Sequence, residues 1–165
     1  MRVIIITGTP GTGKTFLGKK LSRLMKFNYL HIDDVVKEFN LSEKYDRRLR
    51  TKIVDVRKLA MVLVQIIRKS KVDLAIDGHL SYYIPKKYVD LCLVTKCNLR
   101  ILSKRLEIKR YPKLKIRDNL DSEIFDVCLI DALELGHKCL VIDTSMKVDL
   151  KKLNVRIMER LKRKI

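Results

Sequence analysis

The sequence lacks long hydrophobic runs and paired-cysteine motifs. No stretch of about 18 apolar residues occurs in its 165 residues, which argues against a membrane-spanning helix. The first apolar run leads directly into a glycine-rich segment, so we expect no signal peptide. Cys92, Cys97, Cys128 and Cys139 form no C-x-x-C pair. We therefore expect small buried thiols in a reduced, cytoplasmic protein.

Acidic residues are also scarce. Asp and Glu number 19 against 37 Lys and Arg, giving a net charge of +18. Thermophilic proteins also carry many charges, but they usually balance Lys with Glu, and this chain does not. The imbalance favours a polyanionic partner, nucleic acid or ribonucleoprotein, in addition to a nucleotide.

One glycine-rich motif stands near the start, in "VIIITGTPGTGKTFLGKKL" (3–21). Gly8, Gly11, Gly13, Lys14 and Thr15 follow the pattern G-x-x-x-x-G-K-[ST], after a β-branched run and before a helical pattern. Glycines let successive N–H groups point into one concavity, the lysine can reach the β- and γ-phosphates, and the threonine hydroxyl suits Mg²⁺. A chance match is the alternative, but the flanking strand and helix argue against it. The motif predicts binding of a nucleoside triphosphate with Mg²⁺.

Strand and helix patterns alternate along the chain, as in βαβ units. The expected strands are 3–6, 29–32, 72–77, 89–94 and 139–143, and the expected helices are about 14–26, 54–69, 98–109, 118–135 and 149–164. This order predicts one α/β domain spanning 1–165, a five-stranded parallel sheet with helices on both faces. Its nucleotide site lies at the carboxyl ends of the strands.

Two polar segments, 33–53 and 109–118, interrupt the alternation. Both are too polar for a core, so we expect them to lie over the site. The first carries Arg47, Arg48 and Arg50, which could bind the phosphate of an acceptor nucleotide or equally an RNA backbone. The sequence leaves these two roles open.

The second polar segment belongs to a cationic stretch after the fourth strand. Charge runs are usually solvated faces, but here Arg105 and Lys109 share a helical face and lead into "RYPKLKIRDN", which has no apolar period. A lid that brings cations to the phosphates is the better interpretation. Which cation touches phosphate stays open among Lys96, Arg100, Lys104, Arg105, Lys109, Arg110, Lys113, Lys115 and Arg117.

A second motif is "VDLAIDGHLSYYIP" (72–85), an apolar strand that ends in Asp77. An acid at a strand tip beside a phosphate-binding loop can hold the Mg²⁺ shell, although it could instead cap the next turn. His79 could orient water or the acceptor phosphate, or make a structural hydrogen bond. The candidate catalytic residues are Lys14, Asp77 and His79, and the candidate metal ligands are Thr15 and Asp77.

The C-terminal helix "KKLNVRIMERLKRK" (151–164) combines cations with an apolar stripe of Leu153, Ile157 and Leu161. The stripe is better explained by packing on the sheet than by a partner. Its lysines and arginines would then face outward and be free for RNA.

Together these motifs and "RLEIKRYPKLKIRDNLDSEIF" resemble the adenylate kinase isoenzyme 6 (CINAP-type) family, in its archaeal branch. The resemblance covers nearly the whole chain through D-x-H and R-L-x(4)-Y-x(6)-D-N-x(3)-E. It implies the P-loop kinase fold and a nucleoside monophosphate kinase with ATPase activity. It also implies a role in late maturation of the small ribosomal subunit (16S rRNA), with ribosomal protein uS11 and pre-rRNA as partners.

The resemblance also implies roles for individual residues. Segment 31–54 would bind the monophosphate and segment 108–118 would form the lid. The nucleotide-binding residues would be Gly11, Gly13, Lys14, Thr15, Phe16, Lys109, Arg110 and Lys147, the last beside the adenine. One departure is Lys109-Arg110-Tyr111, where the family usually has Arg-Gly-Tyr. Lysine lacks the planar fork that grips phosphate, so either Arg110 takes over or lid closure weakens, and a glycine hinge is lost.

Three functions are compatible with these features. The leading expectation is phosphoryl transfer from ATP to AMP. The alternative is a ribosome-assembly ATPase with little true kinase activity, which the charge supports. A kinase for another small metabolite is a third option, against which the lid and D-x-H motifs argue.

Overall fold

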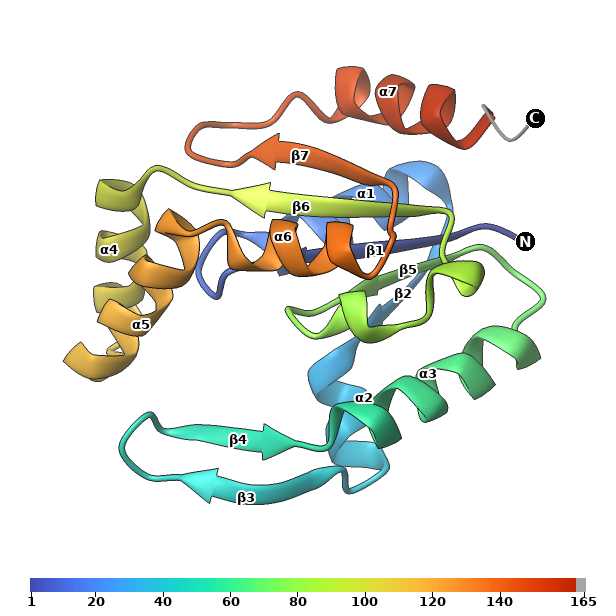
Figure 1. Ribbon diagram of the computed structural model, residues 1–165. Helices are drawn as coiled ribbons and strands as arrows, with labels where there is room; N and C mark the ends of the chain where they lie inside the picture. The colour runs from blue at the N-terminus through green and yellow to red at the C-terminus, as the bar shows by residue number, and fades with distance from the viewer. Residues whose placement is uncertain (163–165) are drawn as a thin grey trace.

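A five-stranded parallel sheet forms the centre of the molecule (Figure 1). The computed structural model of the chain describes residues 1–162. Its strands lie in the order β2-β5-β1-β6-β7. They are β1 (Val3–Gly8), β2 (Asn28–His31), β5 (Leu74–Asp77), β6 (Leu91–Lys96) and β7 (Cys139–Asp143). All five predicted strands are present, and the predicted parallel sheet is confirmed.

The central strand β1 explains why the sequence begins with a β-branched run. All six of its residues are buried, since it pairs with β5 on one side and β6 on the other. Alternate side chains point to opposite faces: Ile4 and Ile6 belong to one core cluster, Val3 and Ile5 to another. A strand covered on both faces needs apolar residues at every position.

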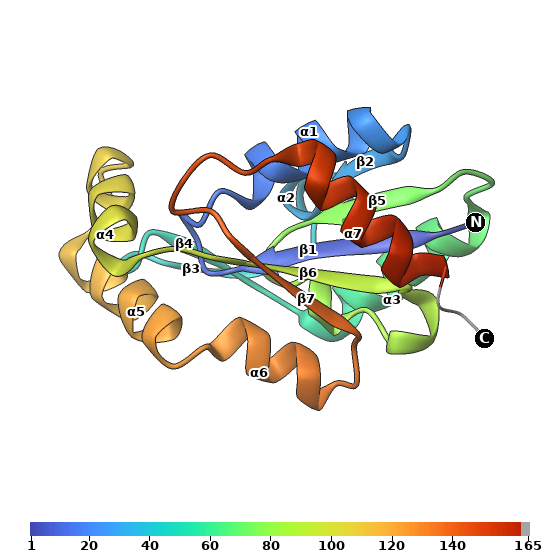
Figure 2. The same ribbon diagram turned by 90° about the horizontal axis from the view of Figure 1, so that it is seen from above.

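Helices cover both faces of the sheet. One face carries α1 (Lys14–Met25) and α7 (Leu150–Lys162), and the other carries α3 (Val56–Lys69) and α6 (Val127–Glu134). Figure 2 shows α1 and α7 side by side on one side of the sheet and α6 on the other. Among residues 1–162, no helix is long and apolar enough to cross a membrane.

The C-terminal helix packs as predicted. Leu153 and Ile157 of α7 are buried, and Leu161 packs partly buried against the same cluster. Residues 163 and 164 of the predicted helix lie outside the described part. All four cysteines are free thiols; Cys92 and Cys97 are buried and the other two half-buried.

The helix predicted over 118–135 is wrong as a single element. The structure has α5 (Lys113–Ile124) and then α6, and Asp126 between them adopts a left-handed φ of 53°. Because α5 begins inside the predicted lid, the irregular part between α4 (Leu99–Ile108) and α5 shrinks to 109–112. The missing apolar period misled the prediction, since the side chains that α5 buries are the polar Asn119 and Glu123.

The polar segment 33–53 is also more regular than expected. It forms α2 (Ile32–Glu38) and an antiparallel hairpin of β3 (Ser42–Asp46) and β4 (Thr51–Val54), separate from the main sheet. The helix contributes Val35 and Val36 to the core, so the expectation of no core contact is wrong there. The hairpin is mostly exposed and extends away from the main sheet (Figure 1). Short helical turns at Ser81–Tyr83 and Lys86–Tyr88 complete the fold.

Candidate functional site

The loop from β1 to α1 has the backbone that its glycines allow. Gly8 and Gly11 have φ of 140° and 92°, in the region that disfavours other residues. A Cβ on Gly8 would lie 2.3 Å from the hydroxyl of Thr95, and one on Gly11 would lie 2.8 Å from a methyl of Leu106. The glycines therefore let the loop pack directly on β6 and α4. We call residues 8–15 the phosphate loop.

Hydroxyl groups hold this loop in one shape. Thr12 donates to the carbonyl of Thr9 (2.7 Å), shares a 2.6 Å hydrogen bond with Thr95, and its own carbonyl accepts from Thr144. Thr9 in turn donates to a carboxylate oxygen of Glu123 (2.6 Å). Strand β6, the turn after β7 and helix α5 thus all fasten the phosphate loop.

Lys14 begins α1 and lies under the loop. Its side chain is buried, and its Nζ donates to the carbonyl of Thr9 over 3.1 Å. Burial lowers the pKa of Lys14, and the nearby charge of Asp77 opposes that shift. A buried ammonium with a single acceptor is a strong site for an incoming anion, since burial without full pairing is costly.

Asp77 ends β5 with no exposed surface. Its Oδ2 accepts hydrogen bonds from the hydroxyls of Thr15 and Tyr29 (both 2.8 Å) and lies 2.9 Å from Nδ1 of His31. Burial raises the pKa of Asp77, but the hydrogen bonds from His31, Tyr29 and Thr15 outweigh it and hold the pKa below its ordinary value. The group is therefore a carboxylate.

The second oxygen of Asp77 is the unusual one. Among the described residues, Oδ1 is buried without any hydrogen-bond partner, and such orphaned atoms are rare. Carboxylate and hydroxyl oxygens are the ligands that Mg²⁺ prefers, so the pair of Thr15 and Asp77 suits a divalent cation. Within residues 1–162, no three His, Cys, Asp or Glu side chains gather into a metal cluster.

His31 is a site residue that the sequence interpretation missed. It lies between Asp77 and Asp33, with Nε2 3.4 Å from the latter. Hydrogen bonds to Asp33 and Asp77 raise the pKa of His31 to about 10, so it is a cation at neutral pH. The H-x-D pattern of His31 and Asp33 at the end of β2 was the available signal, but nothing in the sequence showed that β2 lies beside β5.

His79 follows Asp77 by two residues, and its side chain is exposed. Desolvation by the surrounding protein, then the charge of Lys14, lowers the pKa of His79 to about 4. Because the side chain is exposed, desolvation lowers this pKa less than it would for a buried ring. The ring is neutral at pH 7 in either case, because an ordinary histidine pKa is already about 6.5. A neutral imidazole can both donate and accept a proton.

A cavity of about 800 Å³ opens from the phosphate loop. Seven of the eight predicted nucleotide-binding residues line it: Gly11, Gly13, Lys14, Thr15, Phe16, Lys109 and Lys147. Exposed apolar side chains of Phe16, Ile108 and Met146 offer a surface for a nucleobase. Arg105 also lines the cavity, held by a 2.8 Å hydrogen bond to the carbonyl of Thr144.

Arg110, the eighth predicted nucleotide-binding residue, does not line this cavity. It adopts φ 54°, the left-handed conformation that favours glycine. Beside it, Tyr111 lies under the ammonium groups of Lys109 (6.0 Å) and Lys115 (4.3 Å). Lys115 also donates to the carbonyl of Arg50 over 3.4 Å, which joins this segment to the hairpin.

One predicted role is corrected by the structure. Lys96 belongs to β6 and pairs with Asp126 and Glu123, so it holds α5 in place and is not a mobile lid cation. Glu123 has a matching role: it is 4% exposed and accepts from Thr9 and from the N–H of Cys97 (2.8 Å). The sequence interpretation included Glu123 in a motif but assigned it no function.

Comparisons with known proteins give a matching family model and several relatives. A family model described as an AAA domain matches residues 4–126. The chain is 33% identical to "Putative adenylate kinase" of Methanocaldococcus jannaschii, over 98% of this chain and 86% of that protein. It is 34% identical to "Adenylate kinase isoenzyme 6 homolog FAP7" of Saccharomyces cerevisiae, over 85% and 71%. The corresponding Dictyostelium discoideum homolog is 35% identical, over 85% and 79%.

Solved structures resemble the chain in fold. A shikimate kinase from Bacteroides thetaiotaomicron superposes with a TM-score of 0.56 at 17% identity and covers 98% of both chains. Another from Acinetobacter baumannii, in complex with shikimate, gives 0.59 at 14% identity, over 96% of this chain and 92% of the other. At such identities the likeness concerns the fold alone.

Proposed function

From the premise that this chain belongs to the adenylate kinase isoenzyme 6 homologues and is a nucleotide kinase by family, we propose that it transfers the γ-phosphoryl group of ATP to a nucleoside monophosphate, AMP first. One observation carries the proposal. The phosphate loop and the buried Lys14 line a cavity of about 800 Å³, and Thr15 of the same lining hydrogen-bonds to Asp77. A triphosphate in that cavity would have its transferable group beside these residues.

We propose Mg²⁺ as the metal. Thr15 and the free Oδ1 of Asp77 would hold it directly or through water. When bound, Mg²⁺ neutralises phosphate charge as it develops. Asp77 keeps its carboxylate form for this role, because His31, Tyr29 and Thr15 all hydrogen-bond to its other oxygen.

The protein's own groups supply the remaining steps. The phosphate loop, already held by threonine hydroxyls, presents N–H groups without reorganisation, which is how preorganised donors lower a barrier. Lys14 exchanges its hydrogen bond with the Thr9 carbonyl for a phosphate oxygen. His79, neutral at pH 7, orients the acceptor oxygen or a water molecule by a hydrogen bond.

The acceptor would lie between the phosphate loop and residues 31–54, which we call the acceptor segment. The hairpin of this segment carries Arg47, Arg48 and Arg50, a suitable set for a monophosphate. Lys115 connects α5 to the hairpin through the carbonyl of Arg50. Helix α5 and the hairpin would therefore move together when the site closes over the acceptor.

A second candidate function is hydrolysis of ATP during small-subunit (16S rRNA) maturation, with uS11 and pre-rRNA as partners. The charge of +18 supports this candidate, because a metabolic kinase needs no such excess. Both candidates use one site, with water in place of AMP.

The deciding experiment measures ADP formation from ATP and Mg²⁺ alone, with AMP, and with uS11. Two ADP per ATP consumed, with strong stimulation by AMP, would establish the monophosphate kinase. Stimulation by uS11 or ribosomal RNA, without any response to AMP, would favour the ATPase. Turnover that persists without divalent cations would remove the Mg²⁺ assignment.

A further inference from the structure

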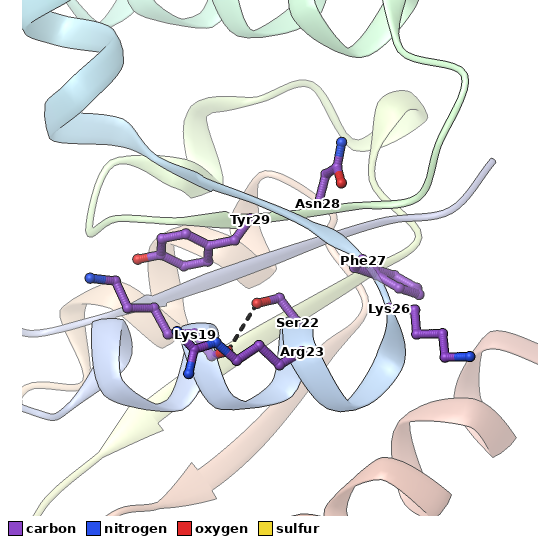
Figure 3. A pocket seen from close by; sticks show the side chains of 7 residues that line it. All are labelled: Lys19, Ser22, Arg23, Lys26, Phe27, Asn28 and Tyr29. Carbon is purple, nitrogen blue, oxygen red and sulfur yellow. Dashed lines mark hydrogen bonds between the residues drawn. The ribbon is translucent and has the colours of Figure 1, made fainter.

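A second cavity of about 470 Å³ lies between α1 and β2 (Figure 3). It is distinct from the nucleotide cavity: the two share no lining residue. Strand β2 is an edge strand of the main sheet, so the groove lies along one side of the molecule. Its lining residues are Lys19, Ser22, Arg23, Lys26, Phe27, Asn28 and Tyr29.

The charge of the groove is entirely positive. Lys19, Arg23 and Lys26 line it, and no carboxylate does. All three cations are exposed, and none forms an ion pair with a side chain of the described chain. Lys19 and Arg23 lie about one turn apart on α1, roughly 6 Å in rise, and Lys26 follows as the left-handed C-cap of that helix. Lys19 also lies over the ring of Tyr29, with its Nζ 5.9 Å from the ring centroid. Three cations without a carboxylate partner match a row of anions.

The other lining groups suit nucleobases. Asn28 is exposed and can donate and accept hydrogen bonds through its amide. The ring of Tyr29 is half-buried, and its hydroxyl is fixed by the hydrogen bond to Asp77. Figure 3 shows this ring extending along α1 toward Lys19. A fixed aromatic ring beside cations is the usual arrangement for binding single strands.

We propose that this α1–β2 groove binds a single-stranded nucleic acid, with its phosphates on Lys19, Arg23 and Lys26 and a base against Tyr29. A flat membrane surface would meet the ridge of the helix and not the concave wall that Asn28 and Tyr29 form. The adjacent helix α7 extends the positive surface through exposed Lys152, Arg156 and Arg160, and α1 and α7 lie side by side (Figure 2).

The proposal gives a location to the nucleic-acid partner of the proposed function, and it rests on that partner but not on phosphoryl transfer. Binding can therefore be measured without ATP. Failure of the groove and failure of the kinase would be seen in separate experiments.

The test uses the full chain and a fluorescein-labelled 12-nucleotide oligouridylate, with anisotropy recorded from 50 to 300 mM NaCl. The groove variant combines Lys19→Ala, Arg23→Ala and Lys26→Ala. The matched control combines Lys86→Ala, Lys87→Ala and Lys138→Ala, which removes three exposed cations outside the groove. Circular dichroism verifies that both variants are folded.

We expect the groove variant to bind about tenfold more weakly at 50 mM NaCl. Its slope of log K against log salt should be shallower by about 2, because each lost phosphate contact on a single strand contributes about 0.7. The control should keep most of the affinity and slope. Equal binding of the deoxy oligomer would support contacts to the backbone.

Four results would overturn the proposal. The groove variant could bind as tightly as the wild type, or the control could lose as much affinity as the groove variant, which would mean diffuse attraction. Alternatively, vesicles with anionic lipid could bind at these residues while the oligonucleotide does not. Absence of oligonucleotide binding by the wild type would remove the nucleic-acid partner as well, and leave the kinase untouched.

Discussion

The phosphate loop and the acceptor segment have parts in the same proposed reaction, yet they are built in different ways. The loop is buried at Thr9, Thr12 and Lys14 and is fastened by side chains from β6, α5 and the turn after β7. The acceptor segment leaves most of its hairpin exposed. The hairpin is held by its own strand pairing, by Val54 packing against the core, and by the hydrogen bond from Lys115 to the carbonyl of Arg50.

This difference separates two tasks. Phosphate charge is stabilised best by donors that are already in place, which requires a loop with little freedom. An acceptor must enter and leave, which requires a segment that can open. The donor side therefore depends on tertiary contacts throughout. The acceptor side joins α2, which packs in the core, to a hairpin that depends mainly on its own strand pairing.

The comparison can be tested directly by native-state hydrogen exchange. Amides of β1 and β6 are in the buried centre of the sheet and should open only with global unfolding. Amides of β3 and β4 should exchange on the order of a thousandfold faster, because few side-chain contacts hold the hairpin. Mass spectrometry of the free protein measures both regions at once. Equal protection in the two regions would show that the hairpin is not an independent opening unit.

Substituting the loop lysine should have the largest effect on activity. Lys14→Ala removes the buried ammonium beside Asp77, and we expect ADP formation to fall at least about a hundredfold, with or without AMP. Lys138→Ala, an exposed lysine at the start of β7, is the control and should keep wild-type turnover. Wild-type turnover in Lys14→Ala would mean that the phosphates bind elsewhere.

The fastening of the loop can be broken at Glu123. Glu123→Ala leaves the hydroxyl of Thr9 and the N–H of Cys97 without their buried acceptor, a change that costs about 3 kcal/mol. For a chain of this size that lowers Tm by roughly 6–12 °C. Glu134→Ala, at an exposed position of α6, should change the free energy of unfolding by less than about 0.5 kcal/mol. Similar melting of both variants would refute the fastening role.

The same difference explains what the sequence could predict. The phosphate loop obeys a fixed spacing, and the five strands are apolar runs, so both were predicted. His31 and Glu123 act across the fold, and no local pattern shows that β2 adjoins β5 or that α5 reaches Thr9. The hairpin was missed because its strands carry no buried face, and periodicity reports only faces that are buried.

Arg110 lies where sequence and backbone disagree. Its φ of 54° costs a non-glycine residue about 1–2 kcal/mol, while glycine adds about 0.5–1 kcal/mol of unfolded-chain entropy. Arg110→Gly should therefore stabilise the protein by up to about 1 kcal/mol in urea unfolding. Arg117→Gly, inside α5, should destabilise it by about 1 kcal/mol. A loss of stability in both variants would mean that the arginine side chain outweighs its backbone strain.

The smallest effect on stability should come from the ion pair of Arg2 and Asp73, which is remote from both regions. It shows how much an ordinary surface contact contributes to the free energy of unfolding. Burial raises the pKa of Asp73, but hydrogen bonds from the main-chain N–H (2.6 Å) and guanidinium (2.8 Å) of Arg2 outweigh it and hold the pKa below its ordinary value. The unfolded state therefore binds more protons near pH 4, and this contribution is present above about pH 4 and lost as pH falls through the folded pKa.

Asp73→Asn should accordingly reduce the free energy of unfolding by under about 1 kcal/mol at pH 7. The difference from the wild type should shrink as the pH falls below 4, because protonated Asp73 and asparagine are both uncharged. Urea unfolding from pH 2.5 to 7 measures the difference. A difference that stays constant over this range would assign the effect to packing. If Asp73→Asn lowered the free energy of unfolding as much as Glu123→Ala does, the buried contacts of the loop would be no stronger than an ordinary surface ion pair.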